Sequence, residues 1–109
     1  MIKKGIFFRL KPDGSEGYIQ AHAAIWPEMR EVLERAGFRN YTIWRHDDLL
    51  FAYYELEDEA VTQEILVNSP VFRRWRTFME SFIFIDPVTG QKEWPMDMVF
   101  LHQGGGNNE

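Results

Sequence analysis

A tyrosine and a histidine one helical turn apart are the residues of this 109-residue sequence best suited to acid–base chemistry. Tyr18 and His22 share one predicted helix face with three apolar residues. Those apolar residues are Ile25, Trp26 and Met29. An imidazole exchanges protons near neutral pH because its unperturbed pKa is about 6.5. The spacing alone also fits a histidine that merely packs in a core, so both interpretations stay open.

A second cluster places three cations around one indole, in the run Arg73-Arg74-Trp75-Arg76. An indole face beside guanidinium donors is typical of a carbohydrate or anion pocket. Arginine stems that cover apolar surface would produce the same pattern. Further rings with polar tips lie on predicted strands, at Tyr41, Trp44, Tyr53 and Tyr54. Aromatic walls with few charges suit a monosaccharide, which is polar but has apolar C–H faces.

The composition excludes several other classes of site. A net charge of -5 argues against a nucleic-acid groove, which needs a clustered basic face. The absence of cysteine excludes disulfides and thiol catalysis. The three histidines lack metal-ligand spacing, so we expect no metal site. With neither a signal peptide nor a run of about 18 apolar residues, we expect a soluble cytoplasmic protein that does not enter a membrane.

The hydrophobic patterns predict the element order β-α-β-β-α-β, with the second helical region in two pieces. The predicted elements are a strand over 2–10, a helix from about 16 that kinks at Pro27 and stops at Gly37, strands over 38–45 and 49–56, a helix from about 59 to 68, a helix over 71–84 and a strand over 96–101. This order is typical of a ferredoxin-like α+β fold, an antiparallel sheet with helices on one face. We expect one domain over 1–103 and a disordered tail over 104–109.

The third predicted strand is apolar on both faces, which points to a partner. One face carries Leu50, Ala52, Tyr54 and Leu56, and the other carries Leu49, Phe51 and Tyr53. Helices cover only one face of such a sheet, and a large exposed apolar patch usually marks an interface or a ligand groove. We therefore expect a homodimer whose sheets pack face to face, with a pocket between sheet and helices.

The motif Y-x-x-x-H-x-x-I-W-P-E at 18–28, together with Asn40-Tyr41 and Arg74-Trp75, resembles the L-rhamnose mutarotase family. The resemblance extends from Met1 to about Leu101. It implies a dimeric ferredoxin-like fold (a dimeric α+β barrel) and interconversion of the α and β anomers of L-rhamnose without a cofactor. It also implies that His22 is the proton donor, that Tyr18 and Tyr41 contact the sugar, and that Trp75 forms part of the sugar-binding wall.

Arg76 departs from the family pattern, which commonly has a second tryptophan there. A charged fork in place of an apolar wall changes what a pocket tolerates. We expect Arg76 to contact the substrate and to shift preference toward another deoxy sugar or an acidic one. The second proton-transfer group is left open between Tyr18 and a water molecule.

Two other classes of protein compete with the mutarotase interpretation. One is a dimeric α+β-barrel monooxygenase, which would share the topology. The other is a sugar-binding module without catalytic activity.

Overall fold

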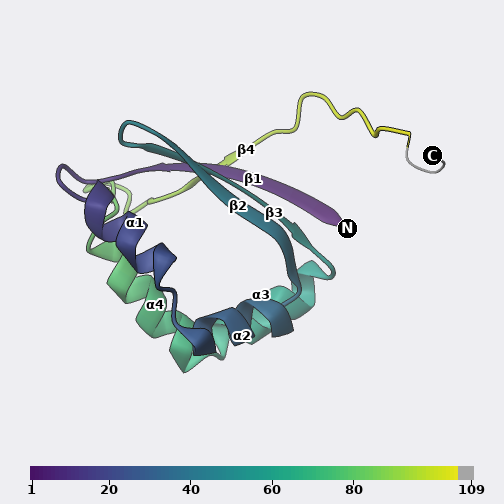
Figure 1. Cartoon of the computed structure of the whole chain (residues 1–109), viewed down its shortest axis with the longest axis horizontal. Coiled ribbons are helices and arrows are strands. Elements are labelled where there is room, and N and C mark those ends of the chain that lie inside the picture. Colours follow the sequence, from purple (N-terminus) through teal and green to yellow (C-terminus); the bar gives the residue numbers. More distant parts are fainter. Residues whose placement is uncertain (106–109) are drawn as a thin grey trace.

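An antiparallel sheet of four strands carries four helices on one of its faces in the computed structural model, which describes residues 1–105 (Figure 1). The elements are β1 (Ile2–Arg9), α1 (Ser15–Ala23), α2 (Pro27–Arg35), β2 (Phe38–His46), β3 (Leu49–Leu56), α3 (Glu59–Val67), α4 (Pro70–Glu80) and β4 (Trp94–Met96). The strand order is β2-β3-β1-β4, and each neighbouring pair is antiparallel. The predicted ferredoxin-like α+β architecture is therefore confirmed.

The helices α3 and α4 begin where their capping residues predict. The Asp58 side chain accepts hydrogen bonds from the backbone N–H groups of Ala60 and Val61, at 3.0 and 3.2 Å. At the start of α4, the Ser69 hydroxyl accepts from the backbone N–H of Phe72 at 3.0 Å. Each cap satisfies backbone donors that have no partner within the helix.

The helix α4 ends at Glu80, four residues earlier than predicted. The chain after it pairs with the end of the first strand instead. The backbone N–H of Lys11 donates to the Phe82 carbonyl at 2.8 Å, and Leu10 and Ile83 form an isolated β-bridge. This long-range pairing takes over backbone groups that a longer helix would have used.

The prediction of one helix kinked at Pro27 is wrong, because two separate helices form. The helix α1 ends at Ala23, and Pro27 is the first residue of α2. Trp26 between them is extended, with φ -61° and ψ 134°. A proline disfavours helical backbone in the residue before it but suits the first helical position, because the missing N–H is not needed there. Pro27 therefore starts the second helix instead of ending the first.

The predicted final strand over 96–101 is also wrong. The strand β4 covers only Trp94–Met96, and residues 97–105 form neither helix nor strand. Val99 and Phe100 are 95% and 80% exposed. Figure 1 shows this segment leaving the sheet, so residues of high strand propensity do not join it in the described part of the chain. Of the expected tail, residues 106–109 lie outside the described part.

A β-bulge in β2 turns both Phe38 and Tyr41 toward the helices, although they are three positions apart. Arg39 pairs with Glu55 and Thr42 pairs with Tyr53, which leaves both Asn40 and Tyr41 opposite Tyr54. Asn40 adopts a left-handed conformation with φ 51°, which asparagine tolerates better than most residues. The extra residue lets Phe38 and Tyr41 face the same side, where their ring centroids lie 5.4 Å apart.

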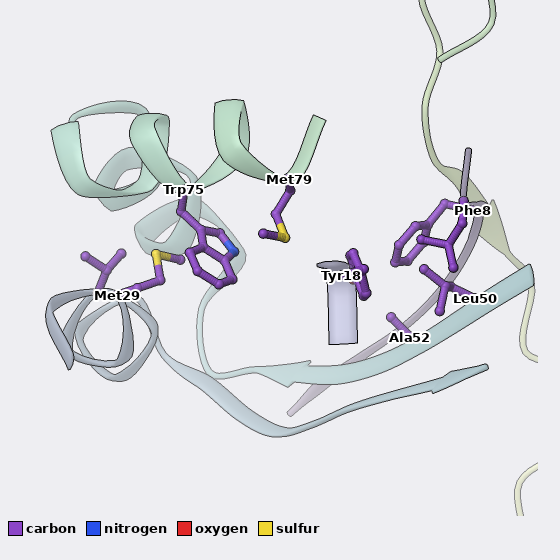
Figure 2. Close-up of a cluster of buried hydrophobic side chains, with 9 residues drawn as sticks. Phe8, Tyr18, Met29, Leu50, Ala52, Trp75 and Met79 are labelled. Atoms are coloured by element: carbon purple, nitrogen blue, oxygen red, sulfur yellow. The ribbon is translucent and has the colours of Figure 1, made fainter. Parts of the chain in front are cut away.

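The core lies between the helices and the inner face of the sheet. Figure 2 shows the Tyr18 ring between the α4 side chains Trp75 and Met79 and the sheet residues Phe8 and Leu50. These five side chains are between 2% and 7% exposed. No helix in residues 1–105 is long and apolar enough to cross a membrane.

The outer face of the sheet carries a row of aromatic side chains, one from each strand. Trp44 is opposite Phe51, Phe51 is opposite Phe7, and Phe7 is opposite Trp94. The rings of Phe7 and Trp94 stack with centroids 5.6 Å apart. Trp44 is 68% exposed and Phe51 is 37% exposed. The predicted second apolar face is therefore present, and the helices do not cover it.

Candidate active site

A cavity of about 750 Å³ lies between the sheet and the helices. This volume falls within the usual range for small-molecule sites, about 300–1,000 Å³. The five residues predicted from the sequence all line it: Tyr18, His22, Tyr41, Trp75 and Arg76. They come from α1, β2 and α4, so the fold brings distant parts of the chain to one cavity.

His22 is half-buried, and its environment leaves one ring nitrogen available. Its Nδ1 lies 3.0 Å from the backbone carbonyl oxygen of Tyr18. A carbonyl oxygen can only accept, so Nδ1 carries the hydrogen and Nε2 is the nitrogen left to exchange a proton. Burial lowers the pKa of His22, and the hydrogen bond to the Tyr18 carbonyl opposes this with a smaller effect.

Two tyrosines that line the cavity keep their phenols protonated. The Tyr18 ring is 5% exposed and its centroid lies 4.3 Å from that of His22. Burial, followed by the neighbouring Tyr41 and Glu93, raises the pKa of Tyr18. Tyr41 as a whole is 40% exposed, but desolvation of its phenol, followed by Tyr54 and Glu93, raises its pKa too. Both phenols therefore act as hydrogen-bond donors at neutral pH.

Trp75 belongs to the packed core and also lines the cavity. It is 7% exposed, and its ring meets the edge of His22 at a centroid distance of 5.4 Å. On its other side, Trp26 packs against it at 5.0 Å and stacks on Phe78 at 5.9 Å. Trp26 thus packs against the core and does not line the cavity.

Arg76 lies at the cavity with an exposed side chain. Its guanidinium carbon lies 5.6 Å from the centroid of the Phe72 ring, a distance typical of a cation–π contact. This contact orients the guanidinium group along the cavity wall, where its N–H groups can donate to a ligand.

Comparison with known protein families shows which family the chain belongs to. The model of the L-rhamnose mutarotase family matches residues 3–102. The chain belongs to this family. The L-rhamnose mutarotase of Cronobacter sakazakii is 36% identical over 104 residues, which cover 92% of this chain and 97% of the relative. That of Enterococcus faecalis is 35% identical over 89 residues, which cover 80% and 85%.

Solved structures show that this mutarotase family shares its fold with proteins of other activities. The L-rhamnose mutarotase from Formosa agariphila has a TM-score of 0.79 at 21% identity, covering 94% of this chain and all of the other. Tetracenomycin F2 cyclase from Streptomyces glaucescens has a TM-score of 0.70 at 14% identity, covering 96% of this chain and all of the other. An antibiotic biosynthesis monooxygenase reaches 0.61 at 15% identity, covering 91% and 99%. The fold alone therefore does not decide between the mutarotase and monooxygenase classes.

Two aromatic residues of the predicted sheet group do not reach the cavity of this mutarotase-family chain. Trp44 is on the outer face, and Tyr53 donates a hydrogen bond from its hydroxyl to Glu55 beside that face. Arg73 in the basic run donates to the Val67 carbonyl at 2.9 Å. Within residues 1–105, no three His, Asp or Glu side chains are close enough together to hold a metal ion.

Among the charged residues of the cavity that sequence reasoning missed is Glu93. It directly precedes β4, and the predicted strand began three residues after it. A predicted strand that began at Trp94 would have revealed it, because side chains alternate along a strand and the residue before Trp94 then points toward the helices.

Proposed function

We propose that this chain interconverts the α and β anomers of L-rhamnose or a related deoxy sugar, with His22 exchanging a proton with the ring oxygen. As a member of the L-rhamnose mutarotase family it is an isomerase. The observation that supports the residue roles is the convergence of His22, Tyr18, Tyr41 and Trp75 on one cavity.

The chemistry needs only proton transfers around one carbon atom. In ring opening, the C1–O5 bond breaks as the C1–O1 double bond forms, while O5 gains a proton and O1 loses one. The aldehyde then rotates about the C1–C2 bond, and O5 closes on the other face of C1. One positioned acid–base group accelerates such a step by about 10²–10⁴-fold. His22 supplies this group through Nε2, since Nδ1 is held by the Tyr18 carbonyl.

The remaining residues bind and orient the sugar. Tyr18 and Tyr41 donate hydrogen bonds to sugar oxygens, because their raised pKa values keep the phenols protonated. Trp75 provides an apolar surface for the C–H face of the ring. Arg76 donates to a sugar oxygen at the cavity wall, and we propose that it tunes which sugar is preferred.

Anomer-exchange NMR on L-rhamnose tests the proposal. The wild type should accelerate exchange, and His22→Ala should lose about 10²–10⁴-fold of that acceleration. His46→Ala is the matched control, because its side chain is 81% exposed at the far end of β2. Sugar binding by saturation-difference NMR with unchanged exchange in His22→Ala would instead identify a sugar-binding module in which His22 is not catalytic.

A panel of sugars tests the role of Arg76. If Arg76 shifts the preference, L-fucose or a uronate should exchange faster than L-rhamnose in the wild type, and Arg76→Trp should restore the preference for L-rhamnose. Fastest exchange with L-rhamnose in the wild type would refute the shift and leave the mutarotase proposal intact.

We also propose that the protein is a homodimer whose sheets pack face to face. The support is the aromatic row of Trp44, Phe51, Phe7 and Trp94 on the face that the helices leave uncovered. A dimeric ferredoxin-like protein from an uncultured marine organism is a structural neighbour with a TM-score of 0.54 at 12% identity. A second copy would remove this row from water, which is the usual fate of a contiguous apolar patch.

The cytoplasm is the location that we propose, since a free metabolic sugar is the proposed substrate. Fractionation of cells that express the tagged protein tests this, and recovery in an extracytoplasmic fraction would contradict it.

A further inference from the structure

We infer that Glu93 is the second proton-transfer group of this cavity, the base that takes the proton from the anomeric hydroxyl while His22 serves the ring oxygen. This inference rests on the proposed mutarotase function and adds a residue to it.

The pairing of β4 with β1 turns Glu93 toward the cavity. Trp94 is opposite Phe7, and their rings stack on the outer face of the sheet. Successive side chains of a strand point to opposite faces, so the residue before Trp94 points toward the helices. The register continued by one residue places it beside Phe8 of β1, which is buried in the core under the helices. Phe8 and Glu93 both line the cavity that contains His22.

Glu93 lines the same cavity as the three tyrosines Tyr18, Tyr41 and Tyr54. Its negative charge contributes to the raised pKa of Tyr18, Tyr41 and Tyr54, which belong to α1, β2 and β3. Charge–charge effects fall with distance and are screened by solvent, so the action of Glu93 on all three phenols agrees with their shared place around the cavity. Since Tyr18 is also the ring beside His22, a sugar that contacts these phenols would lie within reach of both groups.

The other ionisable side chains of the cavity are unsuited to the role. Glu80, the other carboxylate that lines it, is paired with Lys92. The tyrosines keep their protons, and an arginine does not release its proton in a protein. Within residues 1–105, the Glu93 carboxylate makes no hydrogen bond or ion pair, so it is available to a ligand. Its backbone carbonyl accepts from the Gln91 side chain at 3.1 Å, which helps to hold the segment in place.

His22 and Glu93 together account for every proton that the reaction moves. In the reactive form of the pair, Nε2 of His22 carries a proton and the Glu93 carboxylate does not. As the ring opens, Nε2 of His22 gives this proton to O5, and the carboxylate of Glu93 takes the proton of the O1 hydroxyl. After rotation about C1–C2, closure returns the O5 proton to His22 and the carboxyl proton to O1. The enzyme regains its starting state, and no further reactant is needed.

Glu93→Gln tests this role, because the amide keeps the size of the side chain and cannot accept a proton under these conditions. We expect kcat for anomer exchange to fall by about 10²–10⁴-fold with little change in KM. Glu64→Gln is the matched control, as an exposed glutamate on α3, and it should keep wild-type kinetics. Thermal unfolding should be unchanged in both variants, since the Glu93 side chain is exposed.

Chemical rescue provides a second readout that a structural role would not move. In Glu93→Ala, added formate should restore part of the lost exchange rate, and formate should not stimulate the wild type. A Glu93→Gln variant within threefold of the wild-type kcat, or one that raises KM alone, would overturn the inference for Glu93 only. A wild type that accelerates no sugar would overturn the proposed function, and the role of Glu93 with it.

Discussion

Trp44→Asp is predicted to split the proposed homodimer into folded monomers. Trp44 is the most exposed member of the aromatic row and lies on β2, at the edge of the sheet. A second copy would cover its indole ring, whereas an aspartate would place a carboxylate in the same apolar contact. Such a charge is costly to bury without a partner.

The size of the effect follows from the exposed area of the indole. A large aromatic side chain buries about 150–250 Å² in all, and Trp44 is 68% exposed in the single chain. About 100–170 Å² is then left for the partner to cover, equivalent to about 2.5–4 kcal/mol at about 25 cal/mol per Å². A two-fold interface contains the residue twice, so the loss is about 5–8 kcal/mol per dimer. The dissociation constant should rise by at least about 10³-fold.

Sedimentation velocity over a wide range of protein concentration measures this change. The monomer mass is 13.0 kDa, so the wild type should sediment as a species of twice that mass. Trp44→Asp should sediment as the monomer with an unchanged circular dichroism spectrum. Val67→Asp is the matched control, because Val67 is 67% exposed on α3 in the helical layer.

Two results would refute the reasoning about this face. One is a Trp44→Asp variant with the same dissociation constant as the wild type. The other is a Val67→Asp variant that dissociates as readily as Trp44→Asp, because the effect would then come from added charge and not from the sheet face.

Two further predictions concern stability. The pKa of His22 is lowered in the folded state, so the unfolded chain binds a proton more readily. The wild type should therefore lose stability relative to His22→Gln as pH falls below about 6.5, by about 1.4 kcal/mol for each pKa unit by which folding lowers the His22 pKa. Equal pH slopes of the two proteins in urea unfolding would contradict this. Gly14→Ala should cost about 1–3 kcal/mol, because the new methyl group would lie 2.6 Å from the Phe82 carbonyl oxygen, which is itself held by a backbone hydrogen bond. Gly104→Ala meets nothing within 4 Å and should be neutral in the same thermal unfolding assay.

Short-range signals of the sequence were sufficient for the element order and for part of the site. The helices α3 and α4, capped by Asp58 and Ser69, begin within one residue of the predicted positions. Tyr18 and His22 lie on one helix a single turn apart, and their rings meet as the spacing predicts. The two apolar faces of β3 were likewise evident from its alternation. Each of these features depends on residues within about four positions of one another, which local stereochemistry controls.

Local sequence rules predicted the structure less well at the helix boundary near Pro27 and at the bulge in β2. Pro27 was recognised as a helix interruption, but its preference for the first position of a helix prevailed, and α2 begins there. The Asn40 bulge is not visible in an alternation pattern, since Phe38 and Tyr41 face the same side only because an extra residue is inserted opposite Tyr54.

Residue types and spacing identified Tyr18 and His22 as candidates for acid–base chemistry, whereas the packing of distant elements sets which side chains share a cavity. His22, Tyr41 and Trp75 come from three elements, and only the packing of α1 and α4 over the sheet brings them together. Glu93 depended on this most. The predicted final strand covered residues 96–101, but β4 pairs with β1 only over Trp94–Met96. Long-range contacts decide which residues pair with β1, and this pairing turns Glu93 toward the candidate active site.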